Sequence, residues 1–278
     1  MPFTRTQSVL KRLLPERWFA LLYGLACHIY EVWRRISDEI YYLSSYVYYL
    51  LKRDSRNAKR IKTIYSIRLY TMVGRTGLLA TYDIASEIEK SNIGGCFVEC
   101  GVARGGCSAL MAIVANECRN GRKVWFFDSF EGLPEETSED EYQEPILHKP
   151  KDKSASLVSP GYCLGTYEEV EKLLFSKLSL SRNNVFMVKG WFQDTLPKHK
   201  DEIGGISLLR IDADWYESTK CCLENLYDNV IPGGYIVIDD YGSVIGCKKA
   251  TDDFAKNKDL DVKLSFDNRG GCYFVKPR

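Results

Sequence analysis

The sequence of 278 residues has almost no net charge, few histidines and no CxxC pair. A formal charge of +1 argues neither for a nucleic-acid partner nor for an acidic one. The three histidines (His28, His148 and His199) lie without metal-ligand spacing, and the ten cysteines show no zinc or disulfide pattern. We therefore predict reduced, mostly buried thiols in a cytoplasmic protein that binds no nucleic acid.

The sequence also lacks an apolar run long enough for a transmembrane helix. The longest charge-free runs near the N-terminus, 18–30 and 40–51, fall short of the roughly 20 residues that span a bilayer. No small-residue cleavage site follows them, so no cleavable signal peptide is expected. Charge is nevertheless uneven, because residues 1–70 carry 13 Lys and Arg against 5 Asp and Glu. We interpret residues 1–65 as a basic extension.

Within this extension, large apolar residues recur at steps of three and four, a heptad-like seam that predicts a long helix or a helix pair. Such a helix would pack on the body of the protein or on a second subunit, which favours a homo-oligomer. Peripheral membrane contact through its aromatic face is the alternative. The seam consists of Trp18, Leu22, Leu25, Ile29, Trp33, Ile36, Ile40, Leu43, Val47 and Leu50.

From residue 81 onward, strand and helix patterns alternate, which predicts a mainly parallel α/β sheet with helices on both faces. A C-terminal hairpin around 268–271 adds an antiparallel strand. The polar stretch 135–165 is long enough to be a lid within a domain of residues 66–278. Strands are predicted at 96–100, 123–128, 185–189, 206–212, 235–239, 262–266 and 272–275, and helices at 81–90, 107–118 and 167–178.

Two aspartate clusters 27 residues apart are the strongest functional signal. Asp212 and Asp214 follow the apolar run 206–211, and Asp239 and Asp240 follow 234–238. Parallel strands joined by one helical crossover would end at the same sheet edge, about 5 Å apart. Crowded carboxylates suit a hard cation such as Mg²⁺. Arg210, inside the apolar run, is expected to pair with a nearby carboxylate rather than to contact substrate.

The first β-α turn has the composition of a ligand-binding loop. Gly101 and Gly105 let the backbone approach a ligand at the start of the next helix. Glu99 precedes them, where it would repel a pyrophosphate but attract the cationic groups of S-adenosylmethionine. Asp128 ends the second strand, where an acidic side chain can hold ribose hydroxyls. Trp191 and Phe192 could sandwich adenine or simply belong to the core.

Seven segments in order resemble the macrocin-type sugar O-methyltransferases of macrolide and aminocoumarin antibiotic pathways. They are YTMVGRTGLLATYD, FVECGVARGG, FFDSFEGLPEE, VKGWFQDTLP, LLRIDADWYEST, PGGYIVIDDYG and CKKATDDF. The resemblance implies a class I methyltransferase fold of strand order 3-2-1-4-5-7-6, which transfers the methyl group of S-adenosylmethionine to a sugar hydroxyl with Mg²⁺. Residues 1–65 and 137–160 have no match.

The resemblance also implies residue roles. Asp212, Asp239 and Asp240 would bind the metal ion, and Asp214 would act as the base that takes the proton of the sugar hydroxyl. Cofactor contacts would come from Thr71, Met72, Glu99, Gly101, Asp128, Ser129, Trp191 and Phe192.

The sequence therefore predicts an S-adenosylmethionine- and Mg²⁺-dependent O-methyltransferase for a sugar or glycosylated small molecule. Two alternatives remain open: a catechol-type O-methyltransferase, and a non-catalytic S-adenosylmethionine-binding protein assembled through its N-terminal helix.

Overall fold

The computed structural model describes residues 15–118, 120–140, 163–268 and 270–277. The chain divides into two compact units, Met1–Lys62 and Thr63–Arg278. The predicted lid at 135–165 lies mostly outside the described residues, and so does His148.

The first unit contains one long helix, α2 (Glu16–Leu51), as the apolar periodicity predicts. Its 36 residues correspond to a length of about 54 Å. Helix α3 (Ser55–Ile67) starts after Asp54, whose Oδ1 accepts a hydrogen bond of 3.0 Å from the backbone N–H of Asn57. Among the described residues, no helix combines the length and apolar character that crossing a membrane requires.

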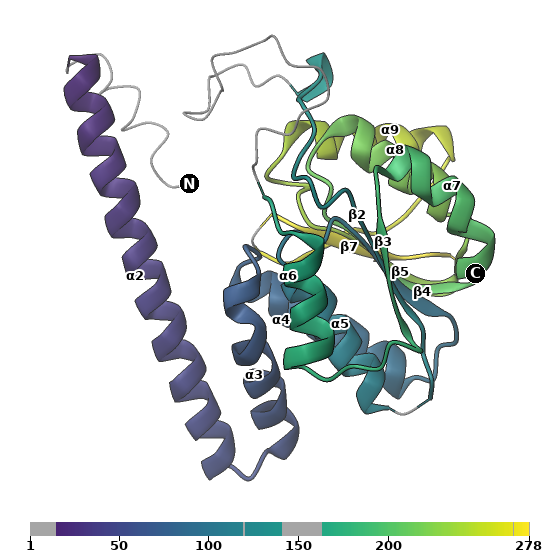
Figure 1. Cartoon of the computed structure of the whole chain (residues 1–278), viewed down its shortest axis with the longest axis horizontal. Helices are drawn as coiled ribbons and strands as arrows, with labels where there is room; N and C mark the ends of the chain where they lie inside the picture. The colour runs from purple at the N-terminus through teal and green to yellow at the C-terminus, as the bar shows by residue number, and fades with distance from the viewer. Residues whose placement is uncertain (1–14, 119, 141–162, 269, 278) are drawn as a thin grey trace. The chain divides into compact units, whose positions relative to one another are not determined.

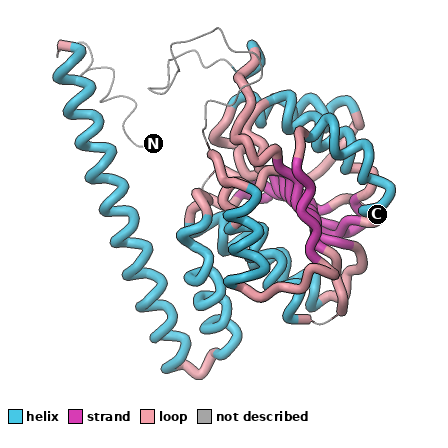
Figure 2. The backbone as a smooth tube through the Cα atoms, viewed as in Figure 1, coloured by secondary structure: helices cyan, strands magenta, loops and turns pink. Residues whose placement is uncertain are grey.

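The second unit is built on a seven-stranded sheet of order β3-β2-β1-β4-β5-β7-β6, which confirms the predicted order. Strands β1 to β5 pair in parallel, and β7 runs antiparallel to both β5 and β6. The strands twist through the centre of the unit (Figure 2). They are β1 (Cys96–Cys100), β2 (Val124–Asp128), β3 (Val185–Lys189), β4 (Ile206–Ile211), β5 (Val230–Ile238), β6 (Ser265–Phe266) and β7 (Cys272–Val275).

Helices cover both faces of this sheet (Figure 1). One layer contains α4 (Arg75–Lys90), α5 (Gly106–Glu117) and α6 (Tyr167–Glu171), which continues as a π-helical turn to Lys177. The other contains α7 (Phe192–Ile203), α8 (Tyr216–Leu226) and α9 (Ile245–Asn257). Two short 3₁₀ helices, η1 (Arg68–Tyr70) and η2 (Ser138–Asp140), lie in the connections.

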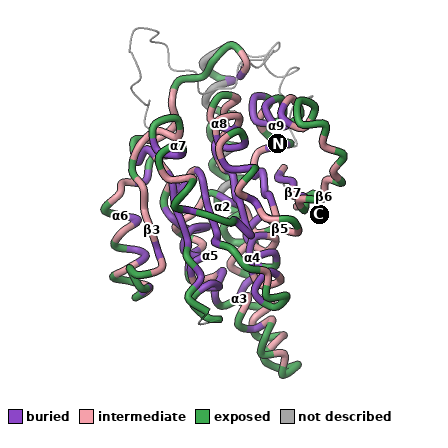
Figure 3. Tube along the Cα trace, turned by 90° about the vertical axis from the view of Figure 1, so that its right-hand side faces the viewer, coloured by how far each residue is buried: buried purple, intermediate pink, exposed green. Residues whose placement is uncertain are grey.

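The core lies on the central strands, which Figure 3 shows as buried. Every residue of β1 and of β4 is buried. Strands covered on both faces need continuous apolar runs, and this is the sequence pattern of 96–100 and 206–211 apart from Glu99, Ser207 and Arg210. These polar exceptions therefore need partners inside the protein.

Three local predictions differ from the structure. The strand predicted at 262–266 is reduced to the two residues of β6 (Ser265–Phe266). Strand β5, predicted to begin at residue 235, begins at Val230, so Pro232, Gly233 and Gly234 lie inside it. Here the pairing of β4 with β5 shifts register and Gly233 has φ +85°, the irregularity in which strand proline and glycine are tolerated. Helix α4 starts at Arg75 rather than at residue 81, after the extended Gly74.

Candidate active site

A cavity of about 500 Å³ opens at the carboxyl ends of β1, β2, β4 and β5. It brings together both aspartate clusters and the glycine turn that the sequence singles out. Gly105 is outside its lining. The predicted site residues that line it are Thr71, Met72, Glu99, Gly101, Asp128, Ser129, Trp191, Phe192, Asp212, Asp214, Asp239 and Asp240.

Gly101 joins the turn after β1 to the end of β4. Its φ is +89°, and a Cβ at this position would lie 1.8 Å from the backbone oxygen of Asp212. The backbone N–H of Asp212 in turn donates to the oxygen of Cys100 at 2.8 Å. The two chain segments can be this close only because residue 101 has no side chain. Gly105 has a different role: it caps α5 at φ +85° and packs against Val170.

We expect Gly101→Ala to lower the free energy of unfolding by about 2–5 kcal/mol. The cost of a left-handed φ for alanine and the cost of the clash with Asp212 add together. Urea unfolding of the purified protein measures this loss. The matched control is Gly121→Ala, where φ is +74° and no atom lies within 4 Å of the added Cβ. This control isolates the φ penalty of about 1–2 kcal/mol. Equal losses in the two variants would contradict the close contact of Gly101 with Asp212.

Glu99 is buried at the base of the cavity, with two partners. Ser108 of α5 donates its hydroxyl to Glu99 Oε2, and Arg210 Nη1 donates to Oε1 at 2.8 Å. Burial raises the pKa of Glu99 to about 7, against the lowering effect of Arg210 and Ser108. An added cation in the cavity would favour the charged carboxylate. The site therefore suits a positively charged ligand group, as the sequence predicts.

Asp128, at the end of β2, organises the loops around the cavity. Its Oδ2 accepts hydrogen bonds from the backbone N–H groups of Val102 (2.6 Å) and Ala103 (3.1 Å), and its Oδ1 accepts one from Phe130 (2.6 Å). Burial raises its pKa, and these backbone bonds oppose the rise. Asp128 thus shapes the glycine turn, in addition to facing the cavity where the ribose contact is predicted.

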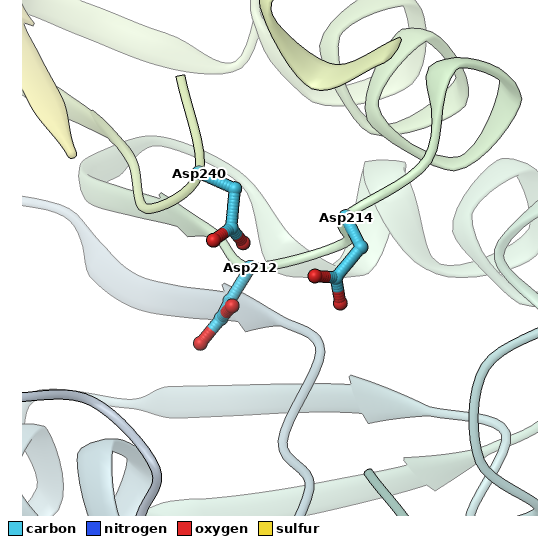
Figure 4. A group of neighbouring side chains, drawn as sticks. All are labelled: Asp212, Asp214 and Asp240. Atoms are coloured by element: carbon cyan, nitrogen blue, oxygen red, sulfur yellow. The ribbon is translucent and has the colours of Figure 1, made fainter. Parts of the chain in front are cut away.

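Three carboxylates from the ends of β4 and β5 form a compact group, shown in Figure 4. One oxygen from each of Asp212, Asp214 and Asp240 lies within 4.8 Å of the other two. Asp214 has φ +53°, a left-handed conformation that is rare outside glycine and that turns the chain sharply after β4. Strain of this kind concentrates at functional sites.

The electrostatics of this group fit a hard cation. Burial raises the pKa of Asp240 well above its usual range, and repulsion from Asp212 and Asp214 adds to the rise. Burial and then repulsion from Asp239 likewise raise the pKa of Asp212. Within the described residues, Asp240 Oδ2 is buried and accepts no hydrogen bond. Several carboxylate oxygens close together, one of them buried without a hydrogen bond, are the kind of ligand set that Mg²⁺ prefers.

Asp239 lies beside this group and contacts Arg210. Arg210 Nη2 donates to Asp239 Oδ1 at 2.6 Å, while its Nη1 donates to Asp212 Oδ2 and to Glu99, each at 2.8 Å. Arg210 is completely buried. The expected pairing of Arg210 with a carboxylate is confirmed and extended to three carboxylates from β1, β4 and β5.

Sequence reasoning missed the support around this cavity. Asp140 is fully buried, and its Oδ1 accepts a 2.7 Å hydrogen bond from the N–H of Tyr216 at the start of α8. Trp215 Nε1 donates to the oxygen of Pro134 at 2.9 Å. Residues 134–140 are thereby fixed next to Asp214. The partners lie 76 and 81 residues apart, so no local pattern could reveal these contacts.

The described lining of the cavity is strongly acidic. It includes eight carboxylate side chains and no Lys, Arg or His. Two of the eight, Glu135 and Glu217, are additional to the predicted residues.

Comparison with known proteins gives consistent matches over most of the chain. Residues 49–276 match the family model of the macrocin O-methyltransferases (TylF). A demethyldecarbamoylnovobiocin O-methyltransferase of Streptomyces niveus is 35% identical over 211 residues, which are 75% of this chain and 76% of that protein. An 8-demethyl-8-(2,3-dimethoxy-alpha-L-rhamnosyl)-tetracenomycin-C 4'-O-methyltransferase of Streptomyces olivaceus is 33% identical over 186 residues, 66% of this chain and 67% of that protein.

Among solved structures, the O-methyltransferase NovP superposes with a TM-score of 0.62 and 32% sequence identity. The match covers 75% of this chain and 83% of that one. The fold is therefore that of a class I methyltransferase.

Proposed function

Because this chain belongs to the macrocin O-methyltransferase family, we propose that it methylates a hydroxyl of a sugar or glycosylated small molecule with the help of Mg²⁺. It is an S-adenosylmethionine-dependent O-methyltransferase. One observation best supports the proposal of Mg²⁺-assisted methylation. The three neighbouring carboxylates of Asp212, Asp214 and Asp240 line the same cavity as Glu99 and the glycine turn.

The donor is assigned to the side of the cavity formed by β1 and β2. We assign to its binding the cavity residues Thr71, Met72, Glu99, Gly101, Asp128, Ser129, Trp191 and Phe192, with Gly105 supporting the turn. Glu99 would attract the cationic groups of the donor, and Trp191 and Phe192 offer aromatic faces to adenine. S-adenosylmethionine supplies a methyl group on a sulfonium centre, and the neutral thioether S-adenosylhomocysteine is a good leaving group.

The metal site is proposed at the ends of β4 and β5, with Asp212, Asp239 and Asp240 as ligands. Asp212 and Asp240 share the compact group, and Asp239 exerts the strongest carboxylate repulsion on Asp212. Mg²⁺ bound there would lower the pKa of an acceptor hydroxyl, which is otherwise far above 7.

Asp214 is proposed as the base. The acceptor oxygen bonds to the methyl carbon as the carbon–sulfur bond breaks, and the hydroxyl proton moves to the Asp214 carboxylate. The products are a methyl ether and S-adenosylhomocysteine. The sharp turn at Asp214 places its carboxylate in the cavity next to Asp212, where an acceptor hydroxyl can reach it.

The acceptor class follows from relatives and from charge. One relative is named for a rhamnosyl 4'-oxygen, which supports a sugar hydroxyl for this chain too. The acidic lining, with Glu135 and Glu217 beyond the donor and metal residues, favours an acceptor without phosphate groups. We therefore propose an uncharged or cationic glycoside rather than a nucleotide-diphosphate sugar.

Calorimetry and product mass test this proposal on the full-length protein. We expect S-adenosylmethionine to bind, and a panel of glycosides with Mg²⁺ to yield a product heavier by one methyl group. Chelation should remove that product, and a nucleotide-diphosphate sugar should be methylated at least tenfold more slowly than its uncharged glycoside. Methylation of a catechol alone, or turnover that survives chelation, would contradict the proposal.

A further inference from the structure

Helix α2 exposes its whole apolar seam. All ten seam residues are between 46% and 67% exposed. Tyr42, which is nearly completely buried, lies on another side of the helix. Isolated exposed apolar residues are common on proteins, but a contiguous row of large ones marks an interaction site.

The row is straight and long. At 100° per residue, the ten positions from Trp18 to Leu50 fall within a sector about 100° wide. They extend over about 48 Å of the helix. Their mean spacing of about 3.6 residues keeps the sector facing one direction along the helix, as a partner helix requires. This length and regularity exceed what a small groove on a globular partner would need.

We propose that the occupant of this seam is the α2 helix of a second copy of the chain, so that the protein is a dimer joined by a two-stranded helical pair. A self-complementary apolar row is the simplest surface from which a twofold-symmetric interface can form. This inference concerns α2 alone and does not depend on the proposed reaction.

The charges of α2 favour a protein partner over a lipid surface. Three Arg and four acidic residues lie in the helix, so it has no excess of basic residues. Arg34 and Asp38 form an ion pair of 3.6 Å away from the seam. Helices that lie on anionic membranes have a polar face rich in Lys and Arg. Ten of the 13 basic residues of 1–70 instead lie outside α2.

The exposed area is sufficient for a stable dimer. Ten large side chains, each about half exposed, present roughly 1,000 Å² per helix, and a standard interface buries about 800 Å² per partner. The family model begins at residue 49, so it covers only the last three residues of α2.

Sedimentation velocity of the full chain tests the proposal. We expect a species of twice the chain mass of 31.8 kDa. Ile36→Glu with Leu43→Glu should weaken the dimer at least about 100-fold, because two charges per helix would be buried without partners. The matched control is Tyr30→Glu with Tyr48→Glu, which adds the same charge at exposed aromatic positions outside the seam. This control should remain dimeric, and all three proteins should bind S-adenosylmethionine equally.

Two results would overturn the proposal: a monomeric wild type, and a seam variant that stays dimeric. If the wild type is monomeric, two measurements identify the occupant of the seam. Sedimentation with vesicles containing anionic lipid, lost in the seam variant, would indicate a membrane. A melting temperature that falls in the seam variant but not in the control would indicate the chain's own body.

Discussion

Replacing Asp214 by asparagine is expected to lower kcat by about 10²- to 10⁴-fold, the usual contribution of a general base. The amide keeps the size and the turn of Asp214 but cannot accept the proton of a hydroxyl at neutral pH. The binding of S-adenosylmethionine should be unchanged, because Asp214 is not among the residues proposed to bind the donor. Single-turnover kinetics with a methylated glycoside as product measures the effect.

The same variant tests whether Asp214 acts as the base or as a metal ligand. The test is needed because oxygens of Asp212, Asp214 and Asp240 lie within 4.8 Å of one another, so all three could bind one ion. Calorimetry with Mg²⁺ should show unchanged affinity in Asp214→Asn and weakened affinity in Asp239→Asn. The reverse result would exchange the two roles, with Asp214 as third ligand and Asp239 held by Arg210 for structure only. Full turnover in Asp214→Asn would remove the base assignment altogether.

Replacing Arg210 by methionine is expected to lower the free energy of unfolding by about 3–5 kcal/mol, because three carboxylates lose their shared cation in the interior. For a unit of this size the melting temperature should fall by roughly 6–20 °C. Methionine fills part of the volume of the arginine side chain, so the loss of stability reflects the missing charge more than an empty cavity.

Two further variants control for this interpretation. Arg182→Met removes a surface pair with Glu171 at 3.0 Å from a side chain that is 63% exposed, and should change stability by less than about 1 kcal/mol. Adding Glu99→Gln to Arg210→Met should restore part of the lost stability at alkaline pH, because Glu99 without Arg210 must take up a proton to stay buried, whereas glutamine need not. A double variant that is no more stable than Arg210→Met would show that Glu99 is not stabilised by Arg210.

The sequence predicted the sheet and its edge because these depend on local and repetitive signals. Apolar runs of five or six residues separated by helical stretches leave few arrangements, and parallel strands place Asp212 and Asp240 side by side once the order is known. The seam of α2 was predictable for the same reason, because periodicity is visible in one segment.

Side-chain pairing was less predictable, because it depends on partners far apart in the chain. The sequence places Asp239 and Asp240 at the same strand end, but only the fold shows that Asp239 contacts Arg210, 29 residues earlier. The Asp140 cap on α8 also depends on a contact across 76 residues. Local patterns specify which residues reach the edge of the sheet, and tertiary packing decides which of them touch.

Arg210 connects the proposed donor site with the proposed metal site. One guanidinium pairs with Glu99, at the proposed donor site, and with Asp212 and Asp239, at the proposed metal site. A charge that binds at one site would change how that guanidinium is shared, so we expect the affinities of the two sites to be thermodynamically linked. Linkage is reciprocal: if the metal ion strengthens donor binding, the donor strengthens metal binding by the same factor.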